Sequence, residues 1–341
     1  MQVRCLRSFF SLIGNPTSKG REVKAVDRLV YYSLMLPESE PRPDLLWQLD
    51  ASLATLRKHN RDVPVALFVY GALNFELSAV CRAHSLMVQQ RGRYEQWLAA
   101  LCPVGWPALA RYPLLHKFLN FDALAGVSAN QILYCDCDTI FFGDVARIFD
   151  RYAGPDLVAR EEVHTSRNHN GADPSFVDES LLTALATIEG AAFVPPFNLG
   201  VVLLNNRIAA RLAPLQGLLV DYAWRFVAWM AQNPATGATA AFGEFKGAGD
   251  ALAVLDAAEA GRALPFPSVN RWILDEVALW MTLGHLPGLR TADFDPRDVV
   301  QNGEFAASDP STASYLICHY FSQNTARIAA WLRSQPSSIS T

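Results

Sequence analysis

Short apolar runs alternate with amphipathic stretches along this chain, and that alternation limits the folds that it can adopt. Residues 28–36 and 63–70 are rich in β-branched and aromatic side chains and end at proline or glycine, which predicts two buried strands. Between them, residues 44–60 carry leucines at helical spacing after Asp44, a residue type that caps helices. This order predicts an α/β fold with a mostly parallel central sheet flanked by helices.

The same alternation continues toward the C-terminal end. Further strands are predicted at residues 131–142, 155–160, 198–205 and 315–321. Further helices are predicted at residues 77–90, 97–101, 113–126, 145–152, 181–190, 209–230, 273–283 and 326–333. The polar stretch 161–179 and the Gly-, Ala- and Thr-rich stretch 232–249 are predicted loops. The first is long enough to suggest a functional loop, for acceptor contact or as a lid.

Composition excludes several classes of protein. Hydrophobic residues make up 51% of the chain, and the net charge of −4 gives no basic field for a nucleic-acid partner. The six cysteines show no framework spacing, which predicts a reduced, cytoplasmic location. No apolar run reaches the roughly 18 residues that a membrane helix needs. The segment 1–14 is a poor signal peptide, and we interpret it as an unpacked tail, with a peripheral membrane contact as the alternative.

Asp136 and Asp138 follow the apolar residues that begin at residue 131, so we expect them at the carboxyl end of a buried strand. That edge is where open α/β sheets bind ligands. Alternate residues of an extended chain project to one face, so the two carboxylates should point together and Cys137 should point away. A divalent cation would relieve their repulsion, and oxygen ligands suit Mn²⁺ or Mg²⁺. The alternative is a chance pair of acids in a strand-end turn.

His319 ends the last predicted strand and is a candidate third ligand. A nitrogen ligand would shift the preference from Mg²⁺ toward Mn²⁺, whereas the alternative for a lone histidine is a packed residue. A competing metal interpretation is zinc on Cys135, Cys137, Cys318 and His319. Cys-x-Cys spacing is unusual for zinc, and alternation places the cysteines opposite the aspartates, so buried structural cysteines are the default.

Two charged residues elsewhere are further candidates. Lys117 lies among apolar neighbours in a predicted helix, where a lysine either extends to solvent or faces phosphates. Asp275 opens another predicted helix together with Glu276. Acids in a first turn usually stabilise the helix dipole, and the functional alternative is contact with sugar hydroxyls or with a cationic transition state.

Polar and small residues at strand ends add a third set of candidates. Asn198 and Gly200 begin a predicted strand, where the amide can donate to sugar hydroxyls and the glycine permits close backbone approach. The alternative is a simple turn before the strand. Tyr32 and Ser33 close the first strand, where an aromatic ring either stacks on a nucleobase or packs in the core.

These segments occur in an order that resembles a known family. They read RLVYYSLML, LLHKFLNF, ILYCDCDTIFFGDV, FNLGVVLLNN, ILDEVALWMTLG and YLICHYFS, and span residues 28–323. The chain is similar to the GT-A glycosyltransferases, most closely to family 8, which includes glycogenin and bacterial lipopolysaccharide galactosyltransferases. The resemblance implies one GT-A (Rossmann-like) domain at residues 25–334, between tails 1–24 and 335–341.

The resemblance also implies roles for individual residues. Asp136, Asp138 and His319 match metal ligands, and Lys117 matches a basic residue near the diphosphate and donor sugar. Asn198 and Asp275 match residues of the donor-sugar pocket. The stretches around Tyr32, Ser33, Cys137 and Gly200 match segments that contact the nucleotide sugar. The implied activity is transfer of a hexose from a UDP-sugar or similar donor to a saccharide, lipid or protein acceptor, with retention of configuration.

Two departures from the family pattern bear on this interpretation. The family often has Asp-Gln where this chain has Asp275-Glu276, which bears on stereochemistry, and it often has glycine and Lys-Pro after the C-terminal histidine, which bears on phosphate contacts. Three alternatives remain: a nucleotidyltransferase of the same fold, a catalytically silent binding module and a metal-dependent hydrolase. The first would need a glycine-rich basic loop after the first strand, and residues 36–43 contain no glycine.

Overall fold

A computed structural model describes residues 27–36, 43–127, 129–162, 165, 177, 179–232, 274–301, 315–320 and 324–334. The tails 1–24 and 335–341, most of the predicted loop 161–179 and nearly all of the stretch 232–249 lie outside these residues. The predicted domain boundaries therefore stay predictions. No helix among the described residues is both long enough and apolar enough to cross a membrane.

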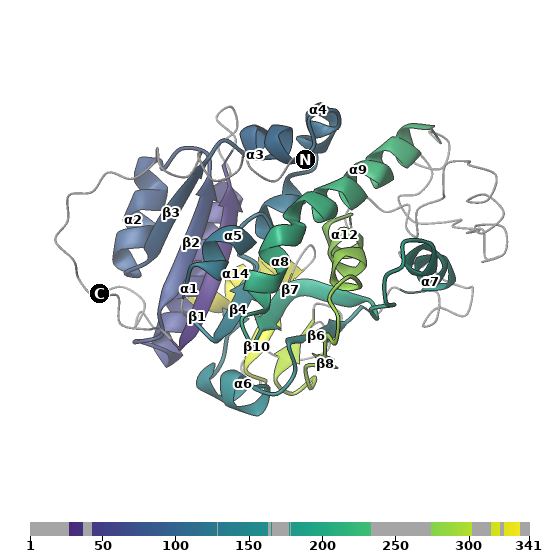
Figure 1. The fold of residues 1–341 in the computed structure, drawn as a ribbon. Helices are drawn as coiled ribbons and strands as arrows, with labels where there is room; N and C mark the ends of the chain where they lie inside the picture. The colour runs from purple at the N-terminus through teal and green to yellow at the C-terminus, as the bar shows by residue number, and fades with distance from the viewer. Residues whose placement is uncertain are drawn as a thin grey trace.

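A seven-stranded sheet forms the centre of the fold (Figure 1). Its strands, in spatial order, are β3 (Met87–Gly92), β2 (Val65–Tyr70), β1 (Arg28–Met35), β4 (Gln131–Cys135), β7 (Phe197–Leu204), β6 (Leu157–Glu161) and β8 (Thr291–Asp293). Neighbouring strands are parallel except where β7 runs antiparallel to β4 and β6. The predicted α/β fold with a mostly parallel sheet is confirmed.

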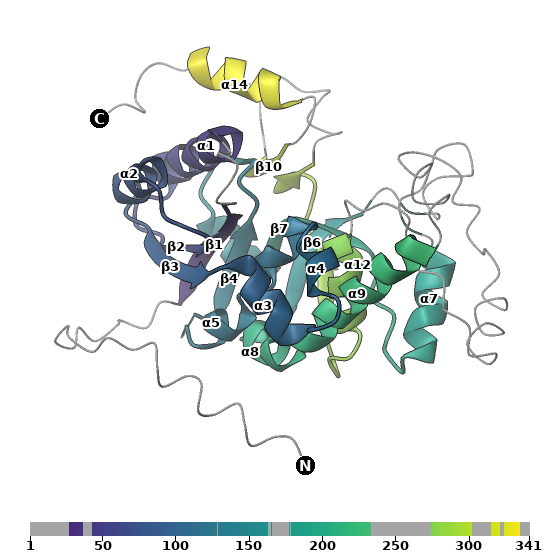
Figure 2. The same ribbon diagram turned by 90° about the horizontal axis from the view of Figure 1, so that it is seen from above.

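Helices cover both faces of this sheet (Figure 2). The helices are α1 (Pro43–His59), α2 (Phe75–Ala83), α3 (Tyr94–Leu101), α4 (Trp106–Leu109), α5 (Phe121–Ala125), α6 (Ala146–Arg151), α7 (Glu179–Ile188), α8 (Ile208–Leu212), α9 (Gln216–Gln232), α12 (Leu274–Leu283) and α14 (Asn324–Ser334). Two 3₁₀ turns, η1 (Pro113–Lys117) and η2 (Ala213–Leu215), connect some of them. Helices α1 and α2 lie on one face, whereas α5, α8, α9 and α12 lie on the other.

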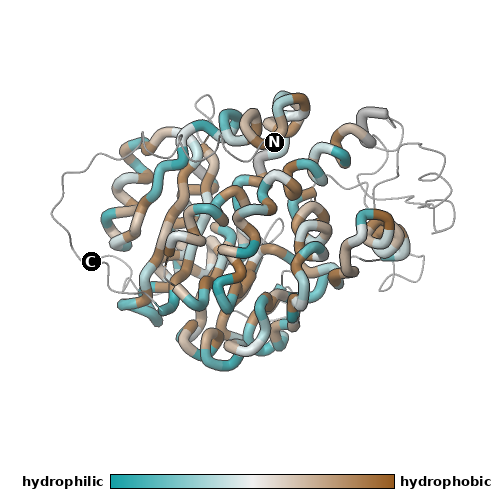
Figure 3. The backbone as a smooth tube through the Cα atoms, viewed as in Figure 1, coloured by the Kyte–Doolittle hydropathy of each residue, from teal (hydrophilic) through white to brown (hydrophobic). Residues whose placement is uncertain are grey.

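Strand β1 shows how the sequence builds the two hydrophobic layers. Its alternate side chains face opposite sides, so Tyr31 packs in the layer beneath α5, α9 and α12, and Tyr32 packs in the layer beneath α1. Both tyrosines are fully buried. Hydrophobic residues are concentrated along the central strands in Figure 3. A strand that is apolar on both faces belongs in the middle of a covered sheet, which is where β1 lies.

A second, three-stranded sheet changes one sequence prediction. Strand β5 (Thr139–Phe141) pairs antiparallel with β10 (Ile317–His319), which pairs parallel with β9 (Val299–Val300). The predicted strand 131–142 is therefore two strands in different sheets, separated by a turn at residues 136–138. The predicted strand 315–321 is shorter, with His319 at its end.

Three predicted helices were also wrong in part. Residues 77–90 form α2 and the edge strand β3, because Ser85 adopts a left-handed φ of 54° that ends the helical stretch. Residues 113–126 form the 3₁₀ turn η1 followed by the short α5, and residues 209–230 are divided among α8, η2 and α9. Proline at the start of η2 explains the second division, because proline cannot donate a helical hydrogen bond.

Candidate metal and ligand site

Asp136, Asp138 and His319 come together at the carboxyl edge of the central sheet. Nε2 of His319 lies 3.4 Å from Oδ1 of Asp138 and 3.8 Å from Oδ2 of Asp136. One ligand atom from each of the three residues lies within 4.8 Å of the others, and this is the group of candidate metal ligands found among the described residues. Two carboxylates and an imidazole suit a hard or borderline divalent ion, so the donor set fits Mn²⁺ or Mg²⁺.

The two aspartates meet through a turn and not through strand alternation. Strand β4 ends at Cys135, and Asp136 to Asp138 form the turn that leads into β5. Backbone hydrogen bonds fix both ends of this turn, from Asp136 N to Gly200 O at 2.8 Å and from Tyr320 N to Asp138 O at 2.9 Å. The turn is thereby held between β7 and the segment that carries His319.

Gly200 makes room for His319. A Cβ atom built on Gly200 would lie 2.0 Å from Nδ1 of His319, which is far inside van der Waals contact. The surrounding strand is irregular, because the pairing of β7 with β6 jumps from Val202 to Asn198 within one residue step of β6. The side chain of Asn198 accepts a hydrogen bond from Gly200 N at 3.0 Å and so supports this irregular segment.

Lys117 connects the aspartate turn to α12. Its Nζ lies 2.9 Å from Oδ2 of Asp136 and 3.4 Å from Oδ2 of Asp275. Burial lowers the pKa of Lys117, but the charges of Asp136 and Asp275 outweigh burial, so the pKa lies above its usual value and the ammonium is retained. The predicted candidates Lys117 and Asp275 are thus in contact with each other, and Lys117 also contacts the candidate metal ligand Asp136.

Asp275 and Glu276 occupy the first turn of α12 and are both buried. Burial raises the pKa of Asp275, and it raises the pKa of Glu276 well above the usual range, with added repulsion from Glu162 and Asp275. Oε1 of Glu276 accepts from Leu199 N at 3.4 Å, so this side chain supports the irregular start of β7. Oδ1 of Asp275 and Oε2 of Glu276 have no hydrogen-bond partner among the described residues.

A cavity of about 610 Å³ opens beside the metal group. It is lined by Ser33, Leu34, Met35, Leu45, Gln48, Arg111, Tyr112, Leu114, His116, Lys117, Asp136, Cys137 and Asp138. The lining includes the end of β1 (Ser33 to Met35) and the turn that follows β4 (Asp136 to Asp138), and these two strands are neighbours in the sheet. From β1, the sheet continues through β2 and β3 on one side and through β4 on the other. The cavity therefore lies at the switch point of the sheet, where open α/β folds bind their ligands.

The cavity lining includes polar residues that were not predicted from the sequence. Arg111 adds a second cationic side chain to the cavity, and Gln48 and His116 add polar groups. Arg111 and His116 belong to the segment around η1, where no strand-end pattern marks them. His116 is adjacent to Lys117 in the sequence and Arg111 lies six residues before it, and this proximity is the signal that would have found them.

The remaining predicted residues differ in whether they reach the 610 Å³ cavity. Ser33 and Cys137 line the cavity, and Gly200 contributes by accommodating His319. Tyr32 does not reach the cavity, because its side of β1 is covered by α1 and its hydroxyl lies 2.9 Å from Ser52 Oγ. Burial, followed by the charges of Asp136 and Asp138, raises the pKa of the Cys137 thiol, which stays protonated.

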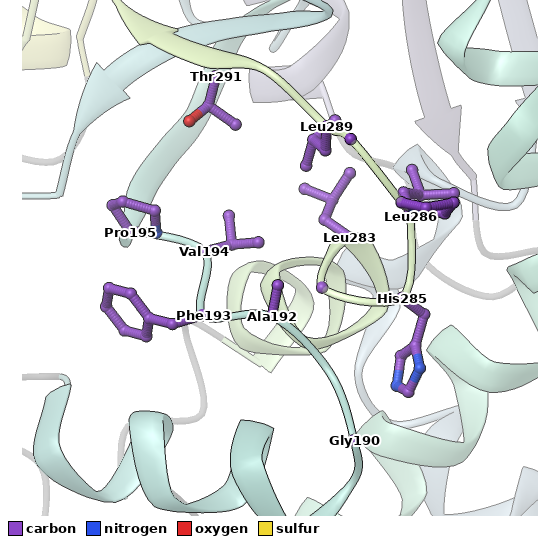
Figure 4. Close-up of a pocket in the computed structure, with 13 residues that line it drawn as sticks. Gly190, Ala192, Phe193, Val194, Pro195, Leu283, His285, Leu286, Leu289 and Thr291 are labelled. Atoms are coloured by element: carbon purple, nitrogen blue, oxygen red, sulfur yellow. The ribbon is translucent and has the colours of Figure 1, made fainter.

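A second cavity, of about 420 Å³, lies at the other end of α12 (Figure 4). Phe193, Val194, Leu286 and Leu289 surround it, with His285 at its side. It contains none of the predicted site residues.

The structure is that of an α/β protein with three candidate metal ligands, Asp136, Asp138 and His319, beside a cavity at the switch point of its sheet. No protein-family model matches the chain, and no curated protein matches it. Solved structures do match. The galactosyltransferase LgtC, in complex with donor and acceptor sugar analogues, is 13% identical with a TM-score of 0.46, over 91% of this chain and 98% of that one.

Two further matches are also glycosyltransferases. GlyE of Streptococcus pneumoniae TIGR4 is 16% identical with a TM-score of 0.46, over 87% of this chain and 56% of that one. Mouse xyloside xylosyltransferase 1 is 15% identical with a TM-score of 0.45, over 88% and 99%. With TM-scores below 0.5, these likenesses assign no activity to this chain.

Proposed function

We propose that this protein is a metal-dependent glycosyltransferase that moves a hexose from a nucleoside-diphosphate sugar, with UDP as the expected nucleotide, to an acceptor hydroxyl. One observation carries the proposal. Asp136, Asp138 and His319 converge beside Lys117 at the edge of the 610 Å³ cavity. A divalent ion and a lysine next to one cavity are what a diphosphate leaving group needs, because negative charge grows on it as the sugar bond breaks.

Each group has a task in this proposal. The ion, held by Asp136, Asp138 and His319, would supply Lewis-acid stabilisation of the departing diphosphate. Lys117 would contribute a fixed positive charge, held in place by its contacts with two carboxylates. Asp275 presents a buried oxygen without a partner, which is suited to accept a hydrogen bond from a sugar hydroxyl. The protein then acts by positioning and charge stabilisation.

Stereochemistry belongs to the proposal as well. We expect retention, in which the acceptor oxygen attacks the face from which the diphosphate leaves. NMR of the anomeric proton of the product tests this directly, and an inverted product would contradict retention without affecting the rest of the proposal.

The test of function is a screen of sugar nucleotides with Mn²⁺, following release of the nucleoside diphosphate. Asp138→Asn removes one ligand charge and should lower release by roughly 100-fold or more, because a Lewis-acid metal stabilises a transition state by several kcal/mol. Asp150→Asn is the matched control, since the Asp150 side chain is 67% exposed. No release from any donor, with unchanged donor affinity in Asp138→Asn, would reject the proposed function.

A further inference from the structure

The Ser33 hydroxyl contacts both the imidazole ring and the backbone carbonyl of His116. Ser33 Oγ lies 2.8 Å from Nδ1 of His116 and 3.1 Å from the carbonyl oxygen of the same residue. The hydroxyl has one proton, and directing it to the carbonyl keeps two oxygen lone pairs from facing each other at 3.1 Å. Nδ1 must then donate to Ser33 Oγ, because two lone pairs would otherwise face each other. This hydrogen-bond arrangement assigns the Nδ1–H tautomer to His116, with the lone pair on Nε2.

Asn120 completes the same hydrogen-bond network. Its Nδ2 lies 3.0 Å from the carbonyl oxygen of His116 and donates to Ser33 Oγ at 3.0 Å. The carbonyl of His116 fixes the orientation of the Asn120 side-chain amide, because Oδ1 of Asn120 would be repelled by that carbonyl oxygen. The hydroxyl of Ser33 thus accepts from Asn120 and from His116 and donates once. Asn120 is fully buried and Ser33 is buried, so water does not compete for these bonds.

The other nitrogen of the ring is available to a ligand. His116 lines the 610 Å³ cavity together with Lys117 and Asp136. No group among the described residues bonds to its Nε2. Burial and the adjacent charge of Lys117 lower the pKa of His116 to about 3, so the ring is neutral near pH 7. A neutral lone pair repels phosphate oxygens and accepts a hydrogen bond from a hydroxyl or N–H group.

We propose that Nε2 of His116 accepts a hydrogen bond from a hydroxyl or N–H group of the bound sugar nucleotide, and that Ser33 is a positioning residue that fixes the tautomer. This inference rests on the proposed function and adds to it a contact that selects for a neutral part of the sugar nucleotide. The metal group and Lys117 favour the charged diphosphate, whereas His116 favours a neutral hydrogen-bond donor. The role predicted for Ser33 from the sequence becomes indirect, because its hydroxyl is engaged within the protein.

Nitrogen-15 NMR of the full chain labelled at histidine tests the tautomer and the contact together. The seven histidines give few signals, and His116→Gln assigns those of His116. We expect a protonated Nδ1 and an unprotonated Nε2, whose resonance moves when UDP or UDP-glucose is added with Mg²⁺. If the Nε2 resonance moves when UDP is added, the hydrogen-bond donor belongs to the nucleoside. If it moves only with UDP-glucose, the hydrogen-bond donor belongs to the sugar. An Nε2–H tautomer, or an Nε2 signal unmoved by a ligand that binds, overturns the inference.

Binding measurements on variants give an independent test. His116→Phe keeps a planar ring without an acceptor and should weaken binding of the ligand that moves the Nε2 signal by roughly 3- to 10-fold, the loss of one hydrogen bond. His116→Gln retains an acceptor oxygen and should lose less, and Ser33→Ala should raise the population of the other tautomer. Equal affinity in wild type and His116→Phe overturns this inference alone. Failure of wild type to bind either ligand instead contradicts the proposed function.

Discussion

The imidazole of His319 lies against the α-carbon of Gly200, so closely that a single methyl group there would fall 2.0 Å from Nδ1. These residues are far apart in the sequence and lie on strands of two different sheets, Gly200 on β7 and His319 on β10. The contact places the histidine where its Nε2 faces Asp138 at 3.4 Å. Gly200 therefore determines the geometry of the metal group without being able to ligate a metal itself.

Gly200→Ala tests this relationship. The added methyl should displace His319 or β7, with a loss of about 1–3 kcal/mol in the free energy of unfolding, as for overpacked sites. Mn²⁺ affinity should fall as well. Urea unfolding and a Mn²⁺ titration measure both quantities. Gly217→Ala in α9 is the control, because a Cβ there meets nothing within 4 Å and alanine in a helix should stabilise by up to about 1 kcal/mol. Unchanged stability and Mn²⁺ affinity in Gly200→Ala would contradict the account.

Lys117→Met tests the buried ion pairs. The substitution leaves the carboxylates of Asp136 and Asp275 without their cation, and the Asp275 side chain is only 2% exposed. Breaking a buried pair from one side costs about 3–5 kcal/mol, and we expect the free energy of unfolding to fall by about that amount. Adding Asp275→Asn should recover part of the loss, because the two residues are in contact. Strictly additive effects in urea unfolding would show that the pair is not coupled.

His116 should make stability depend on pH. Its pKa is about 3 in the folded chain, against about 6.5 for an unfolded histidine, so the unfolded state binds a proton first as pH falls. The contribution of neutral His116 to the free energy of unfolding is fully present above about pH 6.5. Below pH 6.5 it falls by about 1.4 kcal/mol per pH unit, down to about pH 3. His116→Gln should lack this component. The difference between the urea unfolding curves of the two proteins at pH 7.5 and 5.0 measures it, and a constant difference would count against a neutral buried ring.

Glu276 should make stability depend on pH in the opposite direction, and Glu276→Gln should remove that dependence. The pKa of Glu276 is raised in the folded chain, so the unfolded state loses its proton first and stability is lost as pH rises above the usual glutamate range. Glutamine mimics the protonated acid and keeps an oxygen that can accept from Leu199 N. The variant should therefore have a higher melting temperature than wild type at pH 8, with a smaller difference at pH 5. Scanning calorimetry at both pH values measures this, and a variant that is less stable at pH 8 would show a required carboxylate.

Patterns that report burial predicted the fold well. Strands β1, β2 and β7 are largely apolar on both faces because helices cover both sides of the sheet, so their residue types alone identify them. Strand β3 was missed because most of its side chains are exposed, and MVQQRG contains no apolar run. An edge strand is defined by hydrogen bonds to β2, which the sequence does not display.

The site was predictable where residue type determines chemistry. Asp136, Asp138 and His319 were expected to meet and do meet, although the aspartates lie in a turn where strand alternation does not apply. The position of Tyr32 could not be read from the sequence, because only the structure shows that its side chain packs under α1. The contribution of His116 depends on a hydrogen-bond network across three segments, and no local pattern encodes it.

The most direct test of the central claim is the position of the metal ion. Crystals of the full chain grown with Mn²⁺ and UDP should show one anomalous scattering peak at the manganese edge between Asp136, Asp138 and His319, with the diphosphate beside Lys117. A peak at another group of residues, such as the cysteines, or bound UDP without any metal peak at these three residues, would contradict the account.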